Sequence, residues 1–302
     1  VHSFPTRRSS DLNIAHIDID AAEIGKVKQV TWSHVGEAGS TLRQLLAYGR
    51  QTGFGTDYEQ WGAHCQGLRQ RHPMNFKEDG DFIQPQAVMR ALNALTGGNA
   101  IVSTGVGQHQ MWAAQYLDFR RPRLWMTSGS MGTMGFGLPA AIGAQFANPD
   151  ELVIDIDGDG SLRMNLGELE TVTTYGLPVK ILLLNNAGDG MVRQWQKLYF
   201  GDRFSGSDKS LHRKNFIKAA EADGFEFARS VSDPAVMAET LEAFIRFDGP
   251  AFLEVGVDPD ASVYPMVGPG MGYKQMVTGD YIPAREIPEI GRNGRINPSE
   301  SF

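Results

Sequence analysis

The hydrophobic pattern of the chain alternates between short apolar runs and longer amphipathic segments. Apolar runs of three to six residues, typical of buried strands, lie at 100–103, 124–126, 152–156, 181–184, 226–228 and 251–256. Segments with apolar residues at helical spacing lie between them, at 85–96, 138–147, 214–222 and 234–246. Because strands that alternate with helices form parallel sheets, the predicted fold class is α/β with a doubly wound parallel sheet.

The pattern is less regular before this alternation begins. Residues 13–20 read as a strand, and residues 40–49 read as a helix with Ser40 or Thr41 as its N-cap. A polar, glycine-containing stretch over 51–84 is the predicted linker. The predicted domain boundaries are therefore 13–50 for a first domain end, 51–84 for the linker, 85–258 for the main α/β domain and 259–302 for a Gly- and Pro-rich tail.

Residues 1–12 (VHSFPTRRSSDL) fit neither a signal peptide nor a transit peptide. They resemble an in-frame translation of a sequencing-library adapter, so we expect an artefact there and natural sequence from Asn13 onward.

The composition limits which classes of partner and which cellular compartment are expected. The net charge of −7 argues against nucleic acid or an anionic membrane as a partner. The single cysteine, Cys65, excludes an internal disulfide and a cysteine-based metal cluster, which favours a reducing, cytoplasmic location. The sequence contains no run of 18 apolar residues, so no membrane-spanning helix is predicted.

The most informative chemistry follows two neighbouring apolar runs. The first leads into Gly158-Asp159-Gly160-Ser161 and the second into Asn185-Asn186. Because parallel strands joined by a helix end at one sheet edge, Asp159 and Asn186 are predicted to lie together there. Their oxygens suit Mg²⁺, which is commonly held by a few protein oxygens and a phosphate. Gly160 permits close phosphate approach, and Ser161 opens a helix whose N-terminus favours anions.

The alternative for a lone Gly-Asp-Gly is a tight turn without a ligand. The Asn pair at this spacing favours a cradle for a metal and a diphosphate instead.

Two further loops are predicted to leave the same sheet edge. The first, 105–112, places Gln108 and His109 where a strand passes into a helix, a position from which phosphate oxygens can be bound. A structural, capping role is the alternative for His109. The second, 128–137, is rich in glycine and methionine, which suits close contact with a flat ligand but is also ordinary core composition.

Together these loops resemble the thiamine-diphosphate enzymes, and within them the acetolactate synthase (acetohydroxyacid synthase) catalytic subunits. The resemblance covers roughly residues 13–280. It rests on TGVGQHQMWAAQ (104–115), MGFGLPAAIGA (134–144), GMVRQW (190–195) and HIDIDAAEIGK (16–26), besides the Gly-Asp-Gly and Asn-Asn pair. The last of these runs resembles the end of a Rossmann-like, flavin-binding central domain.

The resemblance assigns roles to individual residues. Asp159, Asn186 and the Gly188 carbonyl would hold Mg²⁺. Gln108, His109, Gly160 and Ser161 would meet the diphosphate, Met134 would bend the cofactor, and the Gly132 carbonyl would accept from its amino group. Asp18 and Gly129 would bind FAD. Met191, Val192 and Trp195 would shape the substrate channel, with Trp195 favouring 2-ketobutyrate; a core aromatic is the alternative for Trp195. The small residues at 187–189 depart from many relatives, which puts the stiffness of that loop in doubt.

The implied reaction is decarboxylation of pyruvate and its ligation to a second 2-ketoacid, pyruvate or 2-ketobutyrate, in branched-chain amino-acid synthesis. The family's pyrimidine-activating Glu lies in an N-terminal domain, so we expect no catalytic residue of that kind in this chain. The full enzyme is expected to be a homodimer or tetramer, with a small regulatory subunit as a further partner. Another thiamine enzyme (a pyruvate oxidase or glyoxylate carboligase), a non-catalytic binding module, or a structural loop without ligand are the alternatives.

Overall fold

The computed structural model describes residues 13–55, 57–78, 80–268 and 276–279. The chain divides into two compact units, a smaller one (Val1–Met74 with Pro265–Phe302) and a larger one (Asn75–Tyr264). The expectations for residues 1–12, and for the parts of the tail at 269–275 and 280–302, lie outside the described residues.

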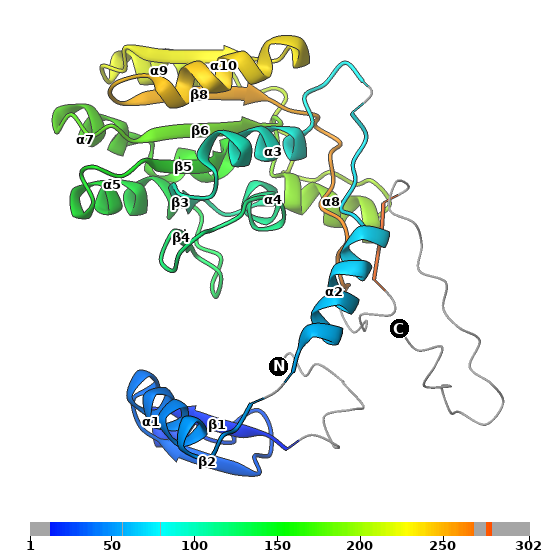
Figure 1. Ribbon diagram of the computed structural model, residues 1–302. Coiled ribbons are helices and arrows are strands. Elements are labelled where there is room, and N and C mark those ends of the chain that lie inside the picture. The colour runs from blue at the N-terminus through cyan, green and yellow to red at the C-terminus, as the bar shows by residue number, and fades with distance from the viewer. Residues whose placement is uncertain (1–12, 56, 79, 269–275, 280–302) are drawn as a thin grey trace. The chain divides into compact units, whose positions relative to one another are not determined.

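A parallel sheet forms the centre of the larger unit (Figure 1). Its strands follow the order β4-β3-β5-β6-β8-β7. All of its paired neighbours run parallel, as the α/β pattern predicts. The strands are β3 (Ile101–Thr104), β4 (Trp125–Thr127), β5 (Val153–Gly158), β6 (Lys180–Asn185), β7 (Phe227–Val231) and β8 (Ala251–Gly256).

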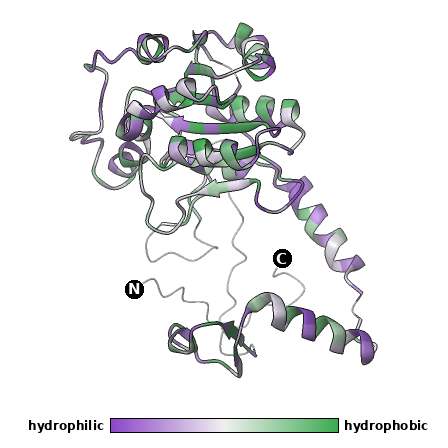
Figure 2. Ribbon diagram, turned by 90° about the vertical axis from the view of Figure 1, so that its left-hand side faces the viewer, coloured by the Kyte–Doolittle hydropathy of each residue, from purple (hydrophilic) through white to green (hydrophobic). Residues whose placement is uncertain are grey.

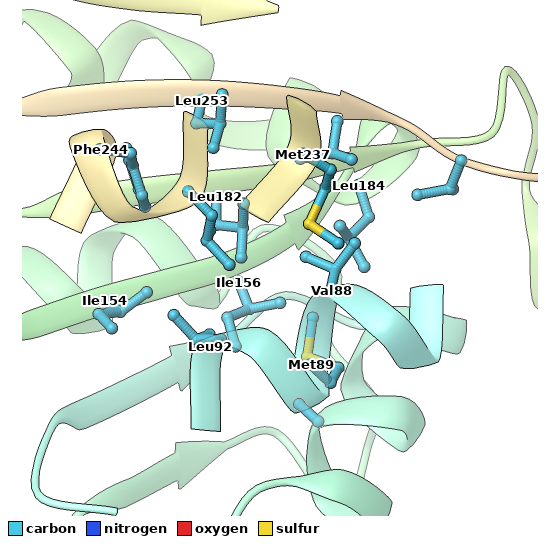
Figure 3. Packing of buried hydrophobic residues seen from close by; sticks show 14 of the residues in the cluster. Val88, Met89, Leu92, Ile154, Ile156, Leu182, Leu184, Met237, Phe244 and Leu253 are labelled. Atoms are coloured by element: carbon cyan, nitrogen blue, oxygen red, sulfur yellow. The ribbon is translucent and has the colours of Figure 1, made fainter. Parts of the chain in front are cut away.

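Helices cover both faces of this sheet because alternate strand residues point to opposite sides. Figure 3 shows one face, where Ile154 and Leu182 meet side chains of α3 (Pro85–Thr96) and α10 (Pro234–Arg246). The residues that precede them on the same strands, Val153 and Ile181, belong to the opposite cluster. That cluster includes residues of α5 (Gly137–Ala147), α7 (Leu169–Thr174) and α9 (Phe216–Ala222). In Figure 2 the hydrophobic colour of the larger unit gathers on and around the sheet.

The strand order creates a reversal point beside β3. The chain passes from β3 to β4 on one side and then returns to place β5 on the other side. Helix α4 (Gln108–Tyr116), which follows β3, packs in the first cluster, whereas α5, which follows β4, packs in the second. The loops after β3 and β5 therefore leave in opposite directions, and the crevice between them is where open α/β sheets bind ligands.

The segment after β5 differs from the prediction of a regular helix. It forms a short α6 (Asp159–Leu162), a 3₁₀ segment η2 (Arg163–Glu168) with non-helical dihedrals at Asn165, and then α7. The expectation that a full helix begins at Ser161 is therefore wrong, and α6 is too short to carry a useful helix dipole.

In the smaller unit, β1 (Ala15–Asp18) pairs in parallel with β2 (Trp32–Val35), and the turn η1 (Ala21–Glu23) lies between them in sequence. Helix α1 (Ala38–Gln51) begins earlier than predicted, and its N-cap is Glu37 rather than Ser40 or Thr41. The stretch proposed as a linker contains helix α2 (Glu59–Arg71). Among the described residues no helix has both the length and the apolar character needed to cross a membrane.

Candidate functional site

A cavity of about 370 Å³ opens at the C-terminal ends of β3, β5 and β6. Loops that are far apart in sequence meet there, as expected from the pattern of strand ends. The predicted site residues that line it are Gln108, His109, Gly132, Met134, Asp159, Gly160, Ser161, Asn186, Gly188, Met191 and Val192.

Asp159 and Gly160 form the floor of this cavity at the start of α6. The Asp159 carboxyl is 5% exposed, and burial raises its pKa to about 6. The nearby Lys209 ammonium opposes that rise, and the Asp189 carboxylate adds to it. A side chain on Gly160 would collide with the Asp189 carboxylate and with the Lys209 ammonium. A residue larger than glycine at position 160 would therefore require the ends of these two side chains to move.

Asn186 is held in place from two sides. Its Oδ1 accepts a hydrogen bond from the Gly188 N–H at 3.2 Å, and its Nδ2 donates to Gln108 Oε1 at 3.4 Å. An amide oxygen has two lone pairs, so Oδ1 keeps one acceptor position beyond the bond to Gly188. The side chain is thus oriented with capacity left for a cation.

The Gln108 side-chain amide is hydrogen-bonded to protein partners. Its Nε2 donates to Gln194 Oε1 at 2.9 Å and to the Ala261 carbonyl at 3.0 Å, which uses both of its amide protons. With its Oε1 accepting from Asn186, the side chain is occupied by protein partners. That Gln108 meets the diphosphate stays a prediction.

Gln194 was missed by sequence reasoning although it is central to this network. It is 3% exposed on α8 (Gly190–Tyr199), and it exchanges two hydrogen bonds with the backbone of Val263, both at 2.9 Å. The only signal in the sequence was a glutamine close to the apolar Met191 and Trp195, which does not distinguish a buried amide from an exposed one. The network ties α8 and the 261–263 segment to the start of α4.

His109 lines the cavity and lies beside a second buried carboxyl. Its Nε2 is 3.5 Å from Asp157 Oδ1, and both residues are buried. Burial lowers the pKa of His109 to about 4, so the imidazole is neutral at pH 7. Burial raises the pKa of Asp157 to about 7, and hydrogen bonds from Ser161 and the Gly158 N–H offset part of that rise. His109 therefore offers the cavity a neutral ring.

Ser161 joins two loops through a single oxygen. Its Oγ accepts from the Val106 N–H at 3.1 Å and from the Gly135 N–H at 3.0 Å. The hydroxyl is also hydrogen-bonded to the Asp157 carboxyl, so the side chain is fully used within the protein. What Ser161 can offer a ligand is its backbone N–H, since the first N–H groups of a helical turn have no intrahelical acceptor.

A comparison with known families fits this geometry. Residues 105–255, half of the chain, match the family model "Thiamine pyrophosphate enzyme, C-terminal TPP binding domain". The chain belongs to the thiamine pyrophosphate enzymes. The matched segment runs from the loop after β3 to β8, so it contains the lining loops of the cavity.

Individual thiamine pyrophosphate enzymes are similar over most of this chain. It is 44% identical over 278 residues to "Acetolactate synthase 1, chloroplastic" of Nicotiana tabacum, which covers 89% of this chain and 42% of the relative. The "Acetolactate synthase large subunit" of Corynebacterium glutamicum is 39% identical (93% and 47% covered). The mitochondrial catalytic subunit of Saccharomyces cerevisiae acetolactate synthase is 40% identical (92% and 40% covered). The chain thus spans less than half the length of these relatives.

The cavity fits the cofactor of the thiamine pyrophosphate enzymes. At Gly160 a Cβ would lie against the ends of the Asp189 and Lys209 side chains, and the oxygen donors of the cavity are one buried carboxylate and one oriented amide. No group of three His, Cys, Asp or Glu side chains suited to a metal occurs in the part of the chain that the structure describes. A cation in this cavity would therefore need amide, backbone and phosphate oxygens besides Asp159, a donor set typical of Mg²⁺.

Three of the predicted residues are not among those that line this cavity. Trp195 is half-buried and packs on Tyr199, with ring centroids 5.0 Å apart, and it does not line the cavity. Gly129 is exposed and its N–H donates to the Thr127 carbonyl. Asp18 lies in the smaller unit, where its carboxylate accepts from the Asp20 N–H at 2.9 Å.

Proposed function

We propose that the cavity at the ends of β3, β5 and β6 binds thiamine diphosphate together with Mg²⁺. Asp159 Oδ, Asn186 Oδ1 and the Gly188 carbonyl would hold the cation. The backbone N–H groups around Gly160 and Ser161 would receive the diphosphate. The observation that carries this proposal is that Asp159 and Asn186 line one cavity over a glycine floor.

Each of the predicted site residues would either bind the cofactor or orient a group that does. Gln108 would fix the Asn186 amide, and the neutral ring of His109 would form the wall beside the diphosphate. Met134 and the Gly132 carbonyl would lie against the organic part of the cofactor. Bound thiamine diphosphate supplies an electron sink that permits loss of CO₂ from a 2-ketoacid.

At the level of the whole protein we propose an acetolactate synthase catalytic subunit. It would decarboxylate pyruvate and join it to a second 2-ketoacid, giving 2-acetolactate or, from 2-ketobutyrate, 2-aceto-2-hydroxybutyrate. The similarity to acetolactate synthases of plant, bacterial and fungal origin supports this choice over other thiamine enzymes. Met191 and Val192, which line the cavity, and Trp195 on the same helix would face the substrates.

The remaining partners belong to this whole-protein proposal. FAD would bind with Asp18 and Gly129, and the active protein would be a homodimer or tetramer with a regulatory subunit. The domain boundaries at 50, 84 and 258 are proposed on the same footing, as is the catalytic Glu supplied by an N-terminal domain. A cytoplasmic location stays a proposal, because the relatives include chloroplastic and mitochondrial proteins besides a bacterial one.

Calorimetric titration of the 302-residue chain with thiamine diphosphate tests the site. We expect binding that requires Mg²⁺, loss of that binding in Asp159→Ala, and unchanged binding in Asp150→Ala, a matched control on an exposed turn. Absence of binding by the unaltered chain, or equal binding by the two variants, would contradict the proposal.

The reaction needs a second experiment. We expect the chain alone to bind the cofactor without producing 2-acetolactate. A fusion of residues 13–302 to the N-terminal part of the Corynebacterium glutamicum relative should convert pyruvate to 2-acetolactate, detected by mass spectrometry. A fusion that binds thiamine diphosphate yet forms no 2-acetolactate would favour a non-catalytic binding module.

A further inference from the structure

A lysine that the sequence did not single out lies against the floor of the cavity. Lys209 is on the segment between α8 and α9, and its N–H donates to the Ala187 carbonyl at 2.9 Å. The Asp189 N–H donates in turn to the Ser207 carbonyl at 2.9 Å, and Gly188 and Asp208 form an antiparallel bridge. The loop that carries Asn186 and Gly188 is thereby paired, backbone to backbone, with the segment that carries Lys209.

The ammonium of Lys209 points to the cradle rather than to solvent. Its side chain is 11% exposed and forms an ion pair with Asp189. A Cβ placed on Gly160 would lie 2.7 Å from Lys209 Nζ. The same ammonium is close enough to Asp159 to oppose the rise in its pKa. One cation therefore stands among two carboxylates at the place where the glycine floor admits a ligand.

The charged side chains around Gly160 favour an anion that binds together with a metal cation. Asp159 and Asp189 are both acidic, so a free diphosphate without compensating cations would be repelled. A divalent ion on Asp159 and Asn186 would neutralise part of the charge. Lys209 would then place a positive charge within reach of Gly160. Ammonium groups are common point-charge ligands of phosphates.

We propose that Lys209 is a diphosphate-binding residue of this site, presented by the 207–209 segment and oriented by its ion pair with Asp189. The inference deepens the proposed thiamine diphosphate site and rests on it. Asp189 is in this view a positioning residue, which holds the ammonium over Gly160 until the diphosphate is bound. The ligand class is a diphosphate ester, for which inorganic pyrophosphate serves as a minimal probe.

The test compares two substitutions that break the same ion pair from opposite ends. Lys209→Gln removes the cation, whereas Asp189→Asn removes only its partner. Lys209→Arg keeps the charge, and Lys218→Gln on the exposed face of α9 is the matched control for loss of one positive charge. For each 302-residue variant, affinity for Mg²⁺-thiamine diphosphate and for Mg²⁺-pyrophosphate is measured by calorimetry, and folding is checked by circular dichroism.

We expect Lys209→Gln to weaken both ligands about tenfold or more, the loss that follows removal of one hydrogen bond to a charged group. Lys209→Arg should recover most of that loss. Asp189→Asn should bind at least as tightly as the unaltered chain, because it removes a negative charge from the cradle. Lys218→Gln should leave both affinities unchanged.

Two outcomes would overturn the inference. Unchanged affinity in Lys209→Gln would remove Lys209 from the binding residues. Equal losses in Lys209→Gln and Asp189→Asn would show that only the ion pair matters, as a brace for the loop. Failure of the unaltered chain to bind thiamine diphosphate at all would instead refute the proposed function, so the two failures are distinguishable.

Discussion

The Asn186 side-chain amide donates to Gln108 Oε1, which links the loop after β6 to the first residue of α4. Gln108 is in turn fixed by Gln194 and by the Ala261 carbonyl. The orientation of Asn186, a proposed metal ligand, therefore depends on Gln108, which lies 78 positions away in the chain. Gln108 in turn depends on Gln194, which lies 86 positions from it. A cation at this site would depend on packing that no local motif describes.

Replacement of Gln108 should affect the metal more than the organic part of the cofactor. In Gln108→Ala, Asn186 and Gln194 lose a partner, and each buried polar group left unsatisfied costs about 1–3 kcal/mol. We expect a higher Mg²⁺ concentration for half-saturation in calorimetry and a lower midpoint in urea. Gln66→Ala, at an exposed position of α2, is the control. A Mg²⁺ requirement equal to that of the unaltered chain would argue against the positioning role.

Ser161→Ala should lower the stability of the larger unit. The buried N–H of Gly135 and the partly buried N–H of Val106 would lose their acceptor, so we expect a loss of about 2 kcal/mol in the free energy of unfolding. Urea denaturation followed by tryptophan fluorescence measures it. Ser230→Ala on the exposed side of β7 should change the free energy little. Equal stabilities of the two variants would contradict the role given to this hydroxyl.

Gly160→Ala should abolish cofactor binding while leaving the fold intact. The added methyl group would collide with Asp189 and Lys209, and it would fill the floor where a phosphate is expected. Gly143→Ala is an informative control, because Gly143 lies in α5 with no atom near the new Cβ. That control should bind normally and unfold at a slightly higher temperature, since alanine is the better helix former by about 1 kcal/mol. Tight thiamine diphosphate binding by Gly160→Ala would place the diphosphate elsewhere.

The buried carboxyl of Asp157 predicts a pH dependence of stability. Its pKa is raised from 3.8 to about 7 in the folded chain, so between these values the folded state binds more protons than the unfolded state. The stabilising contribution is complete below about pH 4 and is lost as the pH rises to 7. The melting temperature of the ligand-free chain should therefore fall relative to that of Asp157→Asn over this range. His109, whose lowered pKa acts in the opposite direction, is present in both proteins. Parallel melting curves across these pH values would refute the prediction.

The sequence predicted helices and strands well where residues close together in the chain determine their bounds. The bounds of α3, α10 and β8 agree with the structure because the apolar spacing that indicates them is local in the sequence. The N-cap of α1 was assigned wrongly because the Glu37 carboxylate, rather than a hydroxyl, accepts from Gly39 and Ser40.

The site shows the same division. The meeting of Asp159 and Asn186 follows from the strand order, which the spacing of the motifs indicates. Gln194 and Lys209 could not be found in this way, because their roles depend on partners that the tertiary fold brings close. The internal use of the Gln108 and Ser161 side chains was hidden for the same reason: a sequence shows which groups are available, whereas their partners are set by packing.

The two hydrogen bonds that Ser161 Oγ accepts limit how this site can evolve. The loop of Val106 and the loop of Gly135 end on one atom, so neither can be remodelled independently of the other. A substitution that widens one loop to admit a different cofactor or substrate will disturb the second loop as well. Changes in specificity are therefore expected to arise on α8, because neither hydrogen bond to this oxygen comes from that helix, and α8 is the practical starting point for redesign.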